Sequence, residues 1–177
     1  MQLRSSQERR LPLAKYKEVT TTGPIEWAKI FENTRDMTGY EGAYEECNGA
    51  YTVNQILDKS EYEKLKAAGT QKKPNQKRLM DGELVVKFER KHLVVTKDGR
   101  EIPQAGGAPK VTDSDGQVWD VDINGGIGNG SMAAVTNLIT TFQGGDGKTY
   151  SRTALVSVKI LEHVPIPERD DDEFEAA

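Results

Sequence analysis

The sequence contains very little cysteine or histidine. Among its 177 residues there are one cysteine, Cys47, and two histidines, His92 and His163. A single cysteine excludes a disulfide within the chain and suggests a reducing compartment. The three residues are far apart in the sequence and have no recognisable zinc-binding spacing. We therefore expect neither a disulfide framework nor a zinc site.

Long apolar runs are also absent. Hydrophobic residues make up 36% of the chain and the mean hydropathy is −0.66. No apolar stretch approaches the roughly 20 residues that cross a bilayer. The first ten residues are polar and basic, without the apolar segment of a secretory signal. A chain of this length and composition is expected to form one soluble domain with extensions.

Acidic residues are concentrated at the end of the chain. From Glu162 to Ala177, seven acids and one arginine give a net charge of −6, whereas the whole chain carries −4. The residues before Glu162 therefore carry a net charge of about +2. After Pro165 and Pro167 the acids are nearly continuous, which predicts a disordered, solvated tail over residues 165–177. Such a tail either only improves solubility or competes with a polyanion for a basic groove.

Apolar alternation and glycine-containing turns predict five main strands and one helix. The predicted strands are residues 50–57, 83–91, 132–142 and 152–161, and residues 25–31, for which a short helix is the alternative. Ser60 and Glu63 have the spacing of a capping box, which predicts a helix over residues 61–68. Gly69 is a typical residue just after a helix end. Residues 71–78 follow as a basic linker.

This order of elements predicts the fold class and the domain boundaries. We predict a mainly β protein: a five-stranded OB-fold-like barrel with one helix, for which a β-sandwich is the alternative. Gly23 and Pro24 are expected to form a turn before the first strand. Residues 92–130 are too long for a simple barrel loop and are expected to hold inserted β-hairpins. The predicted parts are an N-terminal arm (1–20), the barrel domain (21–164) and the acidic tail (165–177).

No arrangement typical of a catalytic site is present. His92 and His163 have no local partner motif, so no nucleophile with a histidine base can be assigned. The glycine-rich residues 125–131 lack the ending of a P-loop and lead into a strand, so we interpret them as a tight turn. Asp113 begins a sequence like that of a calcium loop, but the closing glutamate is replaced by Asn124. We therefore predict no catalysis, no cofactor and no metal.

Basic residues interleaved with aromatic residues recur along the chain. Single-stranded nucleic acid is held by this combination, because cations follow the phosphates while aromatic rings stack on the bases. Bases are predicted to stack on a subset of Tyr16, Trp27, Phe31, Tyr51, Phe88 and Trp119. Phosphate contacts are predicted for Lys15, Lys72, Lys73, Lys77, Lys87, Arg90 and Arg152. The alternative is that these aromatics belong to the core and these cations to solvated loops.

A set of short patterns runs from about residue 20 to the end of the chain. It comprises residues 23–31, 49–59, 65–69, 127–131 and 154–161, and the acidic end that contains Phe174. In these patterns the chain resembles the single-stranded DNA-binding proteins of podovirus-type phages. The resemblance implies an OB-fold barrel that coats single-stranded DNA during phage DNA replication, recombination and repair, in the cytoplasm of the host cell.

The resemblance also implies a role for the tail. In this family the acidic tail contacts the phage DNA polymerase and the helicase-primase, and it can support a homodimer. The residues that would make these contacts here are Asp170, Asp171, Asp172, Glu173 and Phe174. In the best-known relatives an aromatic residue ends the tail, whereas here three residues follow Phe174.

Two other functions stay open. The barrel can be a structural or scaffold module of a virion, which predicts stable oligomers without nucleic-acid binding. It can also be a metal-dependent nuclease, which predicts cleavage that a chelator abolishes. The acids available for that site are Asp113, Asp115, Asp120 and Asp122, with the last two expected on one face of a strand.

Overall fold

The computed structural model describes residues 15–167, in which strands carry most of the regular structure. In chain order the strands are β1 (Lys15–Lys29), β2 (Ala50–Leu57), β3 (Leu84–Lys91), β4 (Lys110–Thr112), β5 (Ser131–Gln143) and β6 (Thr149–Glu162). The helices are α2 (Lys59–Ala67), α3 (Gln76–Met80) and α4 (Val121–Asn124), with a 3-10 helix, η1, at Tyr40–Gly42. Of the helices in this described range, none is long and apolar enough to span a membrane.

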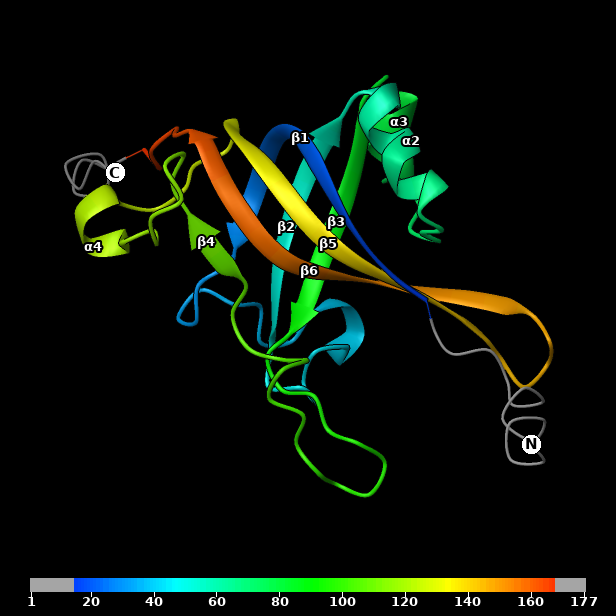
Figure 1. The fold of residues 1–177 in the computed structure, drawn as a ribbon. Helices are drawn as coiled ribbons and strands as arrows, with labels where there is room; N and C mark the ends of the chain where they lie inside the picture. The colour runs from blue at the N-terminus through cyan, green and yellow to red at the C-terminus, as the bar shows by residue number, and fades with distance from the viewer. Residues whose placement is uncertain (1–14, 168–177) are drawn as a thin grey trace, which may run out of the picture.

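The six strands form one curled sheet in the order β3-β2-β1-β5-β6-β4 (Figure 1). Neighbouring strands are antiparallel, except that β4 runs parallel to β6. β3 also lies against β6, and the guanidinium of Arg90 in β3 donates a hydrogen bond to the carbonyl of Leu155 in β6 (3.4 Å). The sheet therefore forms the predicted mainly β, OB-fold-like barrel.

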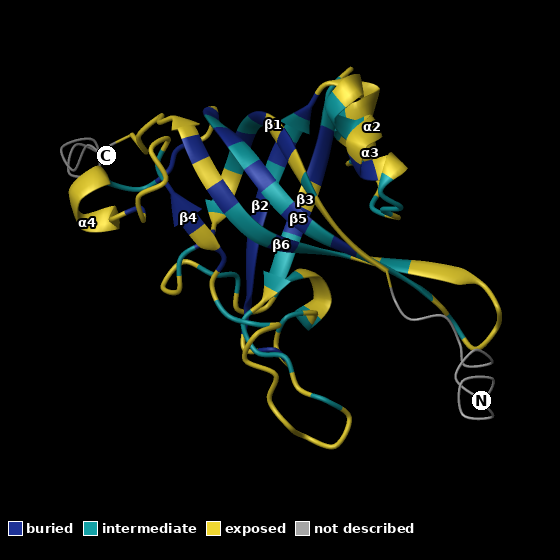
Figure 2. Ribbon diagram, viewed as in Figure 1, coloured by how far each residue is buried: buried dark blue, intermediate teal, exposed yellow. Residues whose placement is uncertain are grey.

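The core lies inside this barrel (Figure 2). Along β5 the buried residues Ala133, Val135 and Ile139 alternate with partly exposed ones, as expected for a strand with one face in the core. They pack in one cluster with Val53 of β2 and Phe88 of β3. The outer face of β5 carries Ala134, Thr136 and Thr140 together with larger apolar side chains, all partly exposed.

β1, β5 and β6 continue beyond the barrel as a three-stranded ribbon (Figure 1). The segment after α2 packs on one side of this ribbon. There the Thr70 and Thr153 hydroxyls lie 2.6 Å apart, and the Gln71 side chain bonds the backbone of Thr149 and Ser151 (both 3.1 Å). These contacts hold the segment after α2 against the ribbon as far as the first residues of β6, while the hairpin turn at the tip is exposed (Figure 2).

Most of the predicted elements are confirmed, with shifted ends. The five predicted strands correspond to β1, β2, β3, β5 and β6, but β1 begins at Lys15, so the end of the predicted N-terminal arm belongs to the sheet. The predicted helix is α2, and Gly69 follows it with φ +99°. The capping box is wrong, because the cap is Asp58, whose carboxylate accepts the N–H of Glu61 (2.8 Å). The basic linker contains an unpredicted helix, α3, capped by the side chain of Asn75.

The hairpins predicted inside residues 92–130 are present. The Thr96 N–H donates to the Arg100 carbonyl, and the Asp113 N–H to the Gln117 carbonyl (both 2.8 Å). The prediction of a strand through Asp120 and its neighbours is wrong. The Asp120 carboxylate instead accepts backbone N–H groups at the start of α4. The insertion thus contributes the edge strand β4 and the short helix α4.

The predicted turn at Gly23 and Pro24 is also wrong, because both residues lie within β1. Gly23 pairs with Ala133 and Pro24 with Met132 of β5. A Cβ atom on Gly23 would lie 2.2 Å from the carbonyl oxygen of Ile56. The glycine is needed here for a close approach of two strands rather than for a turn.

A buried amide, Gln55, completes the contact between β1 and β2. The two strands pair only over residues 25–29 of β1. Before that point the Gln55 Nε2 atom lies 3.1–3.2 Å from the carbonyl oxygens of Thr21, Gly23 and Ala133. Its Oε1 atom accepts the hydroxyl of Thr21 at 2.6 Å. The side chain thus supplies hydrogen bonds that the ladder lacks, as buried carbonyls require.

Asn137 of β5 is the opposite case. It is fully buried, yet neither polar atom of its amide has a hydrogen-bond partner among the described residues. An unpartnered buried amide costs folding free energy.

The two amides provide a matched pair of substitutions of similar size. Gln55→Leu is expected to lower the free energy of unfolding by about 2–4 kcal/mol, because several buried groups lose their partner. Asn137→Leu is expected to leave it unchanged or to raise it by up to about 2 kcal/mol. Urea unfolding of both variants and the parent measures the difference. Equal losses in the two variants would contradict this account of the barrel interior.

Candidate nucleic-acid interface

The outer face of β1, β2 and β3 carries a row of polar side chains. Strand register places Lys87 beside Asn54, and Asn54 beside Glu26. Two residues along, Glu89 and Lys29 flank β2 in the same way. These positions alternate with core residues of β2 and β3, so they face outward. We call Lys29, Asn54, Lys87 and Glu89 the β2–β3 surface.

Acidic and aromatic side chains contact the cations at the β2–β3 surface. The Lys87 ammonium lies 5.5 Å from the ring centroid of Tyr44, and the Tyr44 hydroxyl donates to the Glu89 carboxylate. Glu89 also pairs with Lys72 at 3.6 Å. Burial, followed by the bond to Glu89, raises the pKa of the Tyr44 phenol, which therefore remains a neutral donor. Lys29 and Lys87 form no ion pair within residues 15–167, so their charge is available to an anion.

Asp36 lies close enough to interact with both of these lysines. The N–H of Gly39 is the main cause that lowers the pKa of the Asp36 carboxyl, and the charges of Lys29 and Lys87 lower it further. The loop between β1 and β2 thus brings a carboxylate to the edge of the β2–β3 surface. Lysines and carboxylates are therefore mixed at the β2–β3 surface.

Trp27 is held in an unusual exposed conformation. It lies where the register of β1 against β2 shifts, between Glu26 and Lys29, and its backbone has φ +52°. Its side chain is 64% exposed, and its N–H donates to the Asn129 side chain at 2.8 Å. A left-handed conformation is costly for a large side chain. The bulge nevertheless holds Trp27 in this conformation, and it directs the Trp27 ring into solvent beside Lys29 of the β2–β3 surface.

A second group of predicted residues lies on the ribbon. Tyr16, Thr140 and Arg152 are in register across β1, β5 and β6. The Phe142 and Tyr150 rings stack with centroids 6.1 Å apart, and the Arg152 guanidinium lies 5.0 Å from the Phe142 centroid. Tyr16 is 68% exposed. The ribbon therefore presents aromatic and cationic groups at a distance from the β2–β3 surface.

Several predicted stacking residues belong to the core. Tyr51 and Phe88 are fully buried, and Trp119 is 8% exposed and packed against His163. Phe31 packs against the edge of the core cluster. The alternative interpretation of these aromatics is therefore correct for Tyr51, Phe88 and Trp119, whose rings lie inside the fold and offer no face to a base.

The predicted cations are also divided. The Arg90 guanidinium donates to the carbonyls of Gln104, Gly106 and Gly107 as well as to β6, so it fastens the inserted loop to the barrel. Burial lowers its pKa. The other predicted cations are more accessible: Lys72 is partly exposed at the β2–β3 surface, Lys73 and Lys77 are exposed on the linker and α3, and Lys15 and Arg152 are exposed on the ribbon. The predicted tail residues, Asp170 to Phe174, lie outside the described residues.

The predicted contact residues did not include Lys29, Tyr44 or the pair formed by Phe142 and Tyr150. The last two flank the glycine turn at residues 144–147, and an antiparallel hairpin at that turn places them opposite each other. That signal was available in the sequence. The contact of Tyr44 with Glu89 depends on a long loop, and no local pattern indicates it.

Two of the four acids considered for a metal site, Asp113 and Asp120, have structural partners instead. The Asp113 carboxylate accepts the N–H groups of Asp115 and Gln117, and that of Asp120 starts α4. In the part of the chain that the structure describes, no group of three or more His, Cys, Asp or Glu side chains could hold a metal ion.

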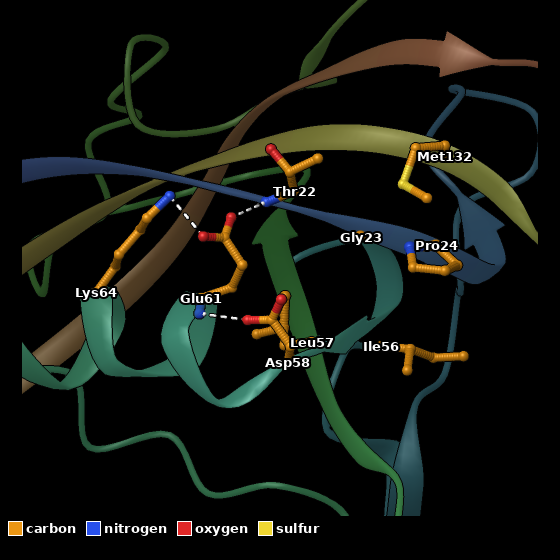
Figure 3. Close-up of a pocket in the computed structure, with 9 residues that line it drawn as sticks. All are labelled: Thr22, Gly23, Pro24, Ile56, Leu57, Asp58, Glu61, Lys64 and Met132. Carbon is orange, nitrogen blue, oxygen red and sulfur yellow. Dashed lines mark hydrogen bonds and ion pairs between the residues drawn. The ribbon is translucent and has the colours of Figure 1, made fainter.

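A pocket of about 640 Å³ lies between α2 and the outer face of β1 (Figure 3). Its polar groups are already engaged. The Glu61 carboxylate accepts the Thr22 N–H at 2.6 Å and pairs with Lys64 at 2.6 Å, while Asp58 caps the helix. Two carboxylates make this pocket unfavourable for an anion.

The fold is similar to that of gp2.5, a single-stranded DNA-binding protein encoded by bacteriophage T7. The two chains share 18% sequence identity, with a TM-score of 0.52, over 92% of this chain and 96% of that one. Two structures of the single-stranded DNA-binding protein from bacteriophage Enc34 also align, at 12% identity. One is a C-terminal truncation (TM-score 0.48, 85% of this chain and 88% of that one) and the other is in complex with ssDNA (0.49, 86% and 89%). No family model and no curated protein matches the sequence. The likeness to gp2.5 confirms the fold that the family resemblance implied.

The conformation of Trp27 makes a testable prediction about stability. Trp27→Gly is expected to be more stable than Trp27→Ala by about 1 kcal/mol, because glycine adopts a positive φ without strain. Urea unfolding of the two variants measures the difference. An alanine variant as stable as the glycine variant would show that the backbone at this position carries no strain.

Proposed function

We propose that this chain is a sequence-nonspecific single-stranded DNA-binding protein of a phage, acting without catalysis in DNA replication, recombination and repair. The host cell cytoplasm is the compartment where it would act. The observation that carries the proposal is Trp27, an exposed ring kept in a strained conformation beside Lys29. The fold shared with gp2.5, which binds single-stranded DNA, supports it.

In this proposal the β2–β3 surface contacts the phosphates and Trp27 stacks on a base. Lys29 and Lys87 are point charges that follow a backbone without reading its sequence. Stacking on an aromatic ring contributes roughly 1–3 kcal/mol per base and accepts any base. Lys72, Lys73 and Lys77 would extend the cationic path, and Lys15, Tyr16 and Arg152 would contact DNA on the ribbon.

Titration of the full chain with fluorescent oligo-dT, a matched duplex and a matched RNA, at several salt concentrations, tests this function. We expect tight binding to the single-stranded DNA and a steep decrease in affinity with salt, because cations on the protein release counterions from DNA. Trp27→Gly is expected to weaken binding by about tenfold or more. Lys97→Ala, an exposed lysine in the hairpin at residues 96–100, is the control. No binding in low salt would leave a structural or scaffold module as the function.

A substitution at the ion pair of Glu89 with Lys72 is expected to strengthen DNA binding rather than weaken it. Glu89→Gln removes a carboxylate from the β2–β3 surface and releases Lys72, so affinity for oligo-dT is expected to rise by about three- to tenfold. Glu63→Gln, which removes an exposed acid from α2, is the matched control. Weaker binding by the Glu89 variant, without loss of fold, would mean that DNA does not bind across this surface.

We further propose that the acidic tail regulates binding and recruits replication proteins. Residues 170–173 carry four consecutive acids that would compete with DNA for the cationic surface, and Phe174 would dock on a partner. The partners in this proposal are the phage DNA polymerase and helicase-primase, together with a second copy of the chain in a homodimer.

Removal of residues 170–177 is expected to tighten DNA binding, most strongly in low salt where the competition is least screened. The same truncation is expected to abolish capture of the polymerase. A truncated chain with unchanged affinity in low salt would exclude the competition.

A further inference from the structure

The outer face of β4, β6, β5 and β1 contains a second groove, of about 440 Å³. Strand register aligns its lining in two rows. Thr136 lies beside Thr20 and Ser157, and Ser157 beside Lys110. In the next row Ala134 lies beside Lys159, and Lys159 beside Thr112. None of the residues on which the proposed function depends lines this groove.

The groove is suited to a phosphate backbone. Lys110 and Lys159 are exposed and form no ion pair within the described residues, and no carboxylate lines the groove. Two acids adjoin lining residues in the chain: Asp113, which is engaged with the N–H groups of its own turn, and the exposed Asp115, which precedes Gly116. Hydroxyls of threonine and serine are spaced between the two ammonium groups, where they can donate to phosphate oxygens.

Thr112 is a second, independent sign of a ligand. Its neighbour Val111 is in the core, so Thr112 faces the groove. The side chain is 8% exposed, and its hydroxyl makes no hydrogen bond within residues 15–167. This hydroxyl is therefore free to donate to a phosphate oxygen in the groove.

The groove continues into the aromatic side of the ribbon. Outward positions along β5 lead from Thr136 through Leu138, which has the exposed Glu18 beside it, and Thr140 to Phe142, which stacks on Tyr150. Six strand residues span about 20 Å, a distance that a few nucleotides cover. Cations and hydroxyls at one end and aromatic rings with Arg152 at the other are the two components of a single-strand site.

This path is separate from the β2–β3 surface. The two share only β1, and the pocket between them is covered by α2 with the carboxylates of Asp58 and Glu61 (Figure 3). A phosphate backbone that crossed directly would meet these acids. On the side of β1, acidic side chains therefore separate the groove from the β2–β3 surface.

We propose that the groove lined by Lys110, Thr112 and Lys159, with the adjoining ribbon, is a second binding surface for the sugar-phosphate backbone of single-stranded DNA. This inference rests on the proposed function. In this proposal the inserted residues 92–130 contribute β4, which forms one wall of the groove.

The test compares full-length variants on a short and a long oligo-dT over a range of salt. Lys110→Ala with Lys159→Ala is expected to lower affinity for the long oligonucleotide about tenfold and to reduce the salt slope by about 1.4, the value for two phosphate contacts on a single strand. The occluded length per protein is expected to shorten. Thr112→Val, which keeps the shape and removes the hydroxyl, is expected to lower affinity two- to fivefold.

Lys59→Ala with Lys97→Ala makes the same change in net charge at exposed sites outside the groove, and less than a threefold loss is expected. If Lys87→Ala loses oligonucleotide binding while the groove variant binds as tightly as the parent chain, the second surface is overturned and the proposed function stays intact. No binding by the parent chain overturns both. A groove variant that changes sedimentation but not DNA affinity identifies the groove as a contact between copies, and also overturns the proposal.

Discussion

The side-chain amide of Gln55 holds together a strand that belongs to two parts of the molecule. β1 pairs with β2 at one end and with β5 along most of its length. Where β1 separates from β2, the buried Gln55 amide bonds carbonyls of β1 and β5. Without it, the inner edge of β1 would leave buried carbonyls unpaired. The close approach at Gly23 depends on the same arrangement, because only glycine leaves room for the carbonyl of Ile56.

This separation of strands explains the distribution of the surface chemistry. Because β1 turns away from β2, α2 can pack over the gap, and its Glu61 caps the free N–H of Thr22. The acids of α2 then stand between the β2–β3 surface and the groove beside β4. Beyond the barrel, β1, β5 and β6 are free to continue as a ribbon that carries Tyr16 and Arg152. One buried interaction thus determines where cations and aromatic rings reach solvent.

Much of the fold could be predicted from local patterns, and less of the site. Apolar patterns and glycine turns identified four of the main strands, context identified the strand at residues 25–31, and Gly69 identified the end of α2. The turn at Gly23 was mispredicted because the same residue serves tight turns and close strand contacts, which only the partner strand distinguishes. Phe88 was mispredicted because an aromatic beside a lysine has the same pattern on a core-facing strand as on an exposed one. Tyr51 and Trp119 were mispredicted because their local sequence does not show which rings the core covers. The groove at β4 unites residues 20, 112, 136 and 159, and no local pattern connects them.

The short edge strand β4 has a consequence for crowding on a DNA strand. A protein that coats DNA as proposed is concentrated far above its level in free solution, and open strand edges would then template polymerisation between neighbours. β4 offers only three residues, Lys110–Thr112, preceded by Pro109 and followed by a hairpin that folds back on it. Proline and lysine at such an edge discourage pairing with another chain. The insertion therefore keeps densely arrayed copies from aggregating through their sheets.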